Sequence, residues 1–178
     1  IATGTIDSKF GFPLANGEEA IATARSASNL NLIGLHFHIG SLIHEAEPYE
    51  QATERVLDFA GAMKKRHGFE MRELDIGGGF AIQYTHDVAS PPVSYYAERI
   101  VSRVITKCRE LGLALPRLVV EPGRAIVGQA GVALYKVGAI KEIPGVRCYV
   151  SVDGGMGDNI RPALYEAKYE AAVANKMG

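Results

Sequence analysis

The sequence has 178 residues, of which 47% are hydrophobic and 22% charged, which suits a globular core of one domain or slightly more. Its net charge of −1 gives no sign of the basic surface that binds nucleic acid or anionic membranes. The two cysteines, Cys108 and Cys148, are isolated, which excludes a disulfide scaffold and indicates a reducing compartment. No apolar stretch is long enough to span a bilayer. We therefore expect a cytoplasmic protein with small-molecule partners, no nucleic-acid partner and no membrane partner.

Strand and helix patterns alternate through the first two thirds of the chain. In chain order, the expected elements are a helix over 17–29, a strand over 31–37, a helix over 45–67, a strand over 71–76, a helix over 90–111 and a strand over 117–120. Repeated strand–helix units of this size predict an α/β fold with a parallel sheet, either doubly wound or a (β/α)8 barrel.

The alternation of strands and helices stops after Arg124. Residues 130–142 and 146–152 read as two long strands with no helix between them, joined through Pro144 and Gly145. Consecutive strands after an α/β run indicate entry into a separate β domain. We place the boundary near residue 127, with residues 1–127 in the α/β part and 128–178 at the start of the β domain.

Unusual residues stand at the end of each of the three expected parallel strands. The first strand leads into HFHIGS at 36–41, the second into three glycines at 77–79, and the third into EPGR at 121–124. Ligands bind at the carboxyl ends of the strands in parallel α/β architectures. The three segments are therefore expected to converge on one site.

The residue types at these strand ends favour a phosphate and a heteroaromatic ring. Three glycines in a row expose backbone N–H groups that can hold an anion, although they also suit a tight turn without a ligand. Arg124 favours the phosphate interpretation, since guanidinium forks bind phosphate or carboxylate. Glu121 follows an apolar strand and needs a partner, either Arg124 or the protonated ring nitrogen of a cofactor such as pyridoxal 5′-phosphate (PLP).

Two histidines allow a different interpretation. His36 and His38 share one face of a strand and could bind a metal ion. A barrel metallohydrolase needs further histidines or an aspartate at later strand ends, where this chain has GGG and EPGR, so we regard metal binding as the weaker alternative. Arg161 and Tyr165 are four residues apart and would share a helix face, but a solvated surface loop explains them equally well.

The order HFHIGS, GGGF and EPGR, with DSKFG at 7–11 and the run from Tyr149 to Tyr169, resembles the fold-type III PLP-dependent decarboxylases, the alanine-racemase-like group. Residues 151–165 are similar to its diaminopimelate-decarboxylating branch in particular. The resemblance implies the last three strands of a (β/α)8 barrel leading into a β-rich C-terminal domain. It also implies PLP as cofactor, conversion of meso-2,6-diaminopimelate to L-lysine and CO2, and a homodimer.

The same resemblance implies a role for each matching residue. His38 would stack on the pyridine ring, and Glu121 would face the pyridine nitrogen. Residues around the cofactor phosphate would be Ser41, Gly78, Gly79, Gly123 and Arg124. Residues that contact the substrate would be Arg124, Arg161 and Tyr165. No metal is implied.

The chain also departs from the family pattern. Leu42, Ala81 and Gly157 stand where the family usually has glutamine, glycine and serine, which leaves the fine substrate preference open. None of the lysines lies in the context of the family's Schiff-base lysine, and the family's acid cysteine is missing. We therefore expect an internal or C-terminal-half piece of a longer protein, with no catalytic residue and no turnover of its own. A non-catalytic PLP-binding or regulatory homologue is the alternative.

Overall fold

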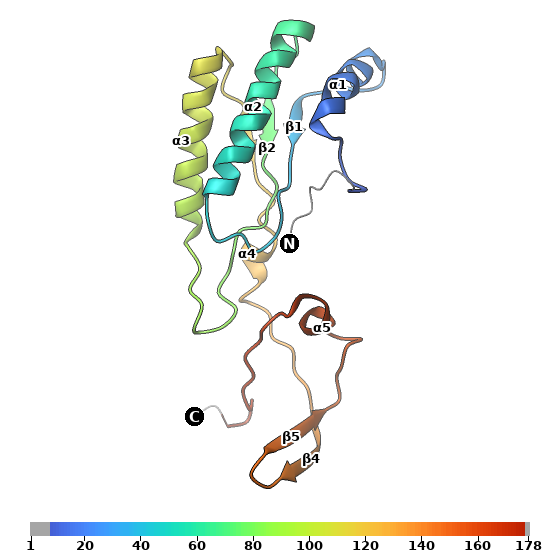
Figure 1. Ribbon diagram of the computed structural model, residues 1–178, viewed down its shortest axis with the longest axis vertical. Helices are drawn as coiled ribbons and strands as arrows, with labels where there is room; N and C mark the ends of the chain where they lie inside the picture. The colour runs from blue at the N-terminus through green and yellow to red at the C-terminus, as the bar shows by residue number, and fades with distance from the viewer. Residues whose placement is uncertain (1–7, 177–178) are drawn as a thin grey trace. The chain divides into compact units, whose positions relative to one another are not determined.

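The computed structural model describes residues 8–176, so Asp7 of the DSKFG segment lies outside the described residues. The contacts divide the chain into two compact units (Figure 1). The first takes in the chain up to Ile82 together with Ser90–Gly128, and the second takes in Gln83–Ala89 together with the chain from Gln129 onward. No helix among residues 8–176 is long and apolar enough to cross a membrane.

The first unit is built on a three-stranded parallel sheet in the order β1-β2-β3. Its strands are β1 (Gly34–His36), β2 (Glu73–Asp75) and β3 (Arg117–Val119). Leu35, Leu74 and Leu118 lie side by side in register across the sheet. The α/β prediction is therefore confirmed, although the ladder pairs fewer residues of each strand than the apolar runs suggested.

Helices connect and cover these strands. They are η1 (Leu14–Asn16), α1 (Gly17–Ser26), α2 (Glu47–His67), α3 (Val93–Leu111) and the short α4 (Arg124–Val127). As predicted, α2 ends at Gly68, whose φ of 63° is in the left-handed region and whose N–H donates to the carbonyl of Lys64. The prolines expected inside the first turn of α3 lie just before it, with Pro92 as its N-cap residue.

The core of the first unit lies where α2 and α3 pack side by side next to the sheet (Figure 1). Large side chains that are at most 2% exposed come from the two helices, the strands and the loops: Tyr49, Leu57, Met63, Phe69, Leu74, Ile76, Tyr96 and Ile100. Each such aliphatic or aromatic side chain stabilises the fold by about 1.5–3 kcal/mol relative to full exposure. This core fixes the strands whose ends carry the predicted site.

The second unit contains an antiparallel hairpin of β4 (Val137–Ile143) and β5 (Arg147–Val152), followed by the short helix α5 (Arg161–Tyr165). Gly145, with φ of 72°, lies in the turn between the strands. The two consecutive strands and the short helix were predicted, but residues 130–136 do not form part of the strand. The reason is that β5 has only six residues, so the pairing ends at Val137 opposite Val152. That the hairpin opens a β domain stays a prediction.

Candidate functional site

The parallel sheet brings the three predicted strand ends together at one edge of the first unit. Backbone hydrogen bonds continue beyond the strands: Phe37 N–H donates to the Asp75 carbonyl at 3.0 Å, and Ile76 N–H to the Val119 carbonyl at 3.1 Å. One residue further along, Glu121 N–H donates to the Gly77 carbonyl at 2.8 Å. The HFHIGS, GGG and EPGR segments therefore share one hydrogen-bonded rim.

The glycine loop lies so close to its neighbours that none of its three positions has room for a side chain, and a Cβ on Gly77 would overlap the carbonyl oxygen of Phe37. A Cβ on Gly78 would overlap the carbonyl oxygen of Glu121, and a Cβ on Gly79 would overlap the carbonyl oxygen of Gly40. Gly77 and Gly79 also have φ of 68° and 95°, which side-chain-bearing residues rarely adopt. The glycines are therefore required by packing, whatever they bind.

The N–H groups of this loop differ in what they bind. Gly77 N–H donates to the Asp75 carboxylate at 2.9 Å, and Gly78 N–H donates to Nδ1 of His38 at 3.3 Å. Gly79 N–H donates to no other described residue, although Gly79 is partly buried. A partly buried N–H without a protein partner beside a glycine-rich turn suits an anion such as a phosphate oxygen.

Tyr49 of α2 binds the same loop with its side chain. Its hydroxyl donates to the carbonyl of Gly78 at 2.9 Å, and its ring stacks on Phe80 with the centroids 5.1 Å apart. Burial holds the pKa of the Tyr49 phenol well above its usual value, because the phenolate is disfavoured away from water. The sequence analysis placed Tyr49 only within the helix expected over 45–67, so its contact with the glycine loop was missed.

His36 and His38 have different partners. Nε2 of His36 lies 3.3 Å from Oε2 of Glu121, whereas Nδ1 of His38 accepts from the Gly78 backbone. Accepting at Nδ1 leaves the proton of a neutral His38 ring on Nε2. The possible ligand atoms of His36, Asp75 and Glu121 lie within 4.8 Å of one another, and His38 is not in this group. The structure therefore does not bring His36 and His38 together as a pair of metal ligands.

The loop after the first strand carries backbone strain. Leu42, which follows Ser41, has φ of 59°, a conformation that is costly for a bulky side chain. Its neighbour Ile43 donates to the Gly79 carbonyl at 3.0 Å and accepts from Ala81 N–H at 3.3 Å. These bonds tie the HFHIGS loop to the glycine loop and hold Leu42 in its strained conformation. Ser41 is partly buried beside them.

Arg161 and Tyr165 lie in the second unit, at the two ends of α5. Tyr165 is 53% exposed. Arg161 is partly buried and hydrogen-bonds to Tyr84 and Tyr169, which the sequence pattern had not singled out. These contacts decide against a fully solvated arginine at this position.

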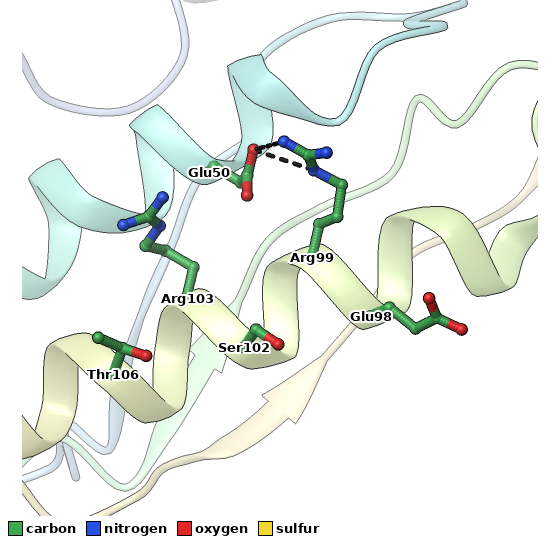
Figure 2. Close-up of a pocket in the computed structure, with 6 residues that line it drawn as sticks. All are labelled: Glu50, Glu98, Arg99, Ser102, Arg103 and Thr106. Carbon is green, nitrogen blue, oxygen red and sulfur yellow. Dashed lines mark hydrogen bonds and ion pairs between the residues drawn. The ribbon is translucent and has the colours of Figure 1, made fainter.

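A shallow hollow lies elsewhere on the first unit, between α2 and α3 (Figure 2). Its lining residues are Glu50, Glu98, Arg99, Ser102, Arg103 and Thr106. Glu50 accepts two hydrogen bonds from Arg99, at 2.8 and 3.2 Å. Because both of its arginines are already paired with carboxylates and none of its lining comes from the strand ends, we do not assign a ligand to this hollow.

Comparison with known proteins finds a pyridoxal-binding family. The family model described as "Pyridoxal-dependent decarboxylase, pyridoxal binding domain" matches residues 1–128. Diaminopimelate decarboxylase from Bacillus subtilis is 46% identical over all of this chain and 41% of its own length, and the protein of that name from Halalkalibacterium halodurans is 44% identical over 99% of this chain.

Solved structures agree with these matches. A diaminopimelate decarboxylase from M. jannaschii superposes with a TM-score of 0.81 at 37% identity, covering 90% of this chain and 36% of that one. The Helicobacter pylori diaminopimelate decarboxylase complexed with L-lysine gives a TM-score of 0.81 at 30% identity, covering 96% of this chain and 40% of that one. The chain thus spans about two fifths of the length of the curated relatives it matches, 41% for the B. subtilis protein.

Proposed function

Because the chain belongs to the pyridoxal-dependent decarboxylase family, we propose that the complete protein uses PLP to decarboxylate meso-2,6-diaminopimelate to L-lysine and CO2. The observation that carries this proposal is the 46% identity to a diaminopimelate decarboxylase over the whole of the chain. The H. pylori relative was solved with L-lysine, the product of the proposed reaction. The rim of three strand ends offers a site for the cofactor.

The architecture of the complete protein is part of the proposal. We assign β1, β2 and β3 to neighbouring strands of a (β/α)8 barrel, and the β4–β5 hairpin to the start of a β domain, with the boundary near residue 127. A homodimer and a cytoplasmic location complete the picture. The superpositions on diaminopimelate decarboxylases support this assignment.

The residues at the rim fit a phosphate group. The N–H of Gly79 lacks a protein partner within the described part of the chain, and Ser41 places a hydroxyl in the adjoining loop. Gly123 leaves room for the phosphate because it carries no side chain, Gly78 would shape the loop around it, and Arg124 would supply the positive charge. These five residues would hold the phosphate of PLP.

Two side chains of the rim suit the ring of the cofactor. His38 presents a flat imidazole that would stack on the pyridine face, with its orientation fixed by the bond from Gly78. Glu121 is on the neighbouring segment, and its carboxylate would accept a hydrogen bond from the protonated pyridine nitrogen. When bound, PLP supplies an electron sink for the electron pair that departing CO2 leaves behind.

Arg124, Arg161 and Tyr165 are proposed to bind the substrate. Guanidinium groups suit the two carboxylates of diaminopimelate, and a phenol can donate one further hydrogen bond. No metal ion is part of this proposal.

The test uses the complete protein with PLP. We expect an absorbance band from protein-bound cofactor and release of CO2 from meso-diaminopimelate, with L-lysine as the other product. The present 178 residues by themselves are expected to show no turnover. A complete protein that binds PLP but releases no CO2 would favour the non-catalytic homologue, and stoichiometric metal in place of PLP would favour the metallohydrolase.

A further inference from the structure

Arg161 is held between two tyrosines of the second unit. Its Nη1 donates to the hydroxyl of Tyr169 at 2.6 Å and to that of Tyr84 at 3.3 Å. The guanidinium carbon lies 5.2 Å from the ring centroid of Tyr84 and 5.8 Å from that of Tyr169. The two rings meet edge to face, with 6.1 Å between their centroids. Hydrogen bonds and cation–π attraction therefore act on the same side chain.

Other contacts hold this cluster in place. Oδ1 of Asn159 accepts from the backbone N–H of Arg161 at 3.3 Å and lies 3.5 Å from the Tyr169 hydroxyl. Tyr84 belongs to the segment Gln83–Ala89. The backbone carbonyl of Gln83 in this segment accepts a hydrogen bond from the side-chain amide of Gln129 at 3.1 Å. The Tyr169 hydroxyl is thus held by Asn159 as well as by Arg161, and the segment that carries Tyr84 is bonded to Gln129.

The donor arrangement of Arg161 leaves one edge available. A guanidinium has five N–H donors, and the two on Nη1 are used by the tyrosines. Nε and Nη2 donate to no other residue that the structure describes, and no described carboxylate pairs with Arg161. The Nε–Nη2 edge presents two parallel N–H groups, which is the geometry that a carboxylate accepts.

We propose that Tyr84 and Tyr169 are positioning residues that hold the guanidinium of Arg161 with its Nε–Nη2 edge turned toward a carboxylate of the amino-acid substrate. The proposal rests on the proposed function, where Arg161 binds substrate. An arginine side chain loses rotamer entropy when it is fixed. The tyrosines already restrict the Arg161 side chain before the substrate binds, so less entropy is lost on binding. They therefore improve substrate binding without touching the substrate.

The test compares Tyr84→Phe and Tyr169→Phe in the complete protein with PLP, each alone and combined with Arg161→Met. Phenylalanine keeps the ring and removes only the hydroxyl. We expect each single change to raise KM for meso-diaminopimelate by about five- to tenfold, with kcat within roughly twofold of the wild type. Because the tyrosines act through Arg161, adding either change to Arg161→Met should raise KM no further.

The matched control is Tyr149→Phe, a tyrosine of the same unit whose ring contacts Arg147 and not Arg161. It should leave KM unchanged, and thermal unfolding of every variant should stay close to the wild type. The inference is overturned if the tyrosine changes leave KM unchanged, or if their effects add to that of Arg161→Met. A wild-type protein that releases no CO2 from diaminopimelate would instead reject the proposed function itself.

Discussion

The two units of the chain reach order in different ways. In the first unit, α2, α3 and the sheet bury a continuous apolar core, and the segments that follow the strands are joined by backbone hydrogen bonds. In the second unit, none of the described residues is buried. A two-stranded hairpin is only marginally stable alone. Other contacts of this unit are between exposed or partly buried side chains, such as those of Arg161 with Tyr84 and Tyr169. The comparison shows that the strand ends of the first unit are set by backbone packing, whereas Arg161 of the second unit is set by side-chain contacts.

A core truncation tests this difference most directly. Leu57 is fully buried in the first unit, so Leu57→Ala should lower the free energy of unfolding of this 178-residue chain by about 2–5 kcal/mol, because it leaves a cavity. Leu134 of the second unit is 78% exposed, and Leu134→Ala should cost less than about 0.5 kcal/mol. Chemical denaturation measures both. Equal losses would mean that the two units do not differ in packing.

Substitution of Glu121 tests whether this residue of the rim contributes to the reaction rate and not to the stability of the fold. Its side chain is 57% exposed, so Glu121→Gln should leave the melting temperature nearly unchanged. Loss of the carboxylate that we propose to face the pyridine nitrogen should lower kcat by about a hundredfold, the usual scale for a group that stabilises a developing charge. Glu142→Gln, on the exposed β4 strand, is the control. A kcat within threefold of the wild type would contradict the role proposed for Glu121.

Gly78 tests the packing of the rim. In Gly78→Ala the new Cβ must displace the Glu121 carbonyl, which should cost about 1–3 kcal/mol of stability and weaken PLP binding. Gly131→Ala is the matched control in the second unit, since its Cβ would meet nothing within 4 Å. Denaturation and cofactor titration by absorbance give the two readouts. If both alanines are equally tolerated, the loops are not packed as closely as described.

Tyr49 links the core to the glycine loop and gives a pH test. Burial raises the pKa of its phenol above the ordinary value of 10.0, so its contribution to stability is complete below pH 10 and is lost as the pH rises further. Tyr49→Phe should cost about 1–2 kcal/mol at pH 7, because the Gly78 carbonyl loses its donor. Between pH 10 and 11 the stability of the wild type should fall more steeply than that of the variant. Parallel curves would exclude Tyr49 as a source of the pH dependence.

The difference between backbone packing and side-chain contacts explains how far the sequence could predict the site. The strand ends were predictable, because the carboxyl ends of parallel strands share one edge and HFHIGS, GGG and EPGR follow apolar runs. Side-chain pairings were not. His36 and Glu121 are 85 residues apart, and Tyr84 and Arg161 are 77 apart, and nothing local marks either pair. Contacts of this kind depend on how the chain folds back on itself, and a single sequence carries no periodic signal for them.

The smallest change in the free energy of unfolding is expected for surface residues of the first unit, because both units have exposed side chains. Arg103 and Glu54 form an ion pair of 2.9 Å across α2 and α3, with both side chains 39% exposed. Arg103→Gln should lower the free energy of unfolding by less than about 0.5 kcal/mol, because exposed pairs gain little over hydration. The loss should shrink further in 1 M salt, where screening acts within about 3 Å.

Arg147→Gln, which removes a cation from the ring of Tyr149 in the second unit, is the comparison for this surface pair. Denaturation at low and high salt should give losses of similar size for the two variants. Similar losses of stability for the two variants would mean that the units differ only in how many apolar side chains they bury. A loss above about 1 kcal/mol for Arg103→Gln alone would show that the pairs between α2 and α3 act as a network, and the stability of the first unit would then owe a measurable part to its surface as well.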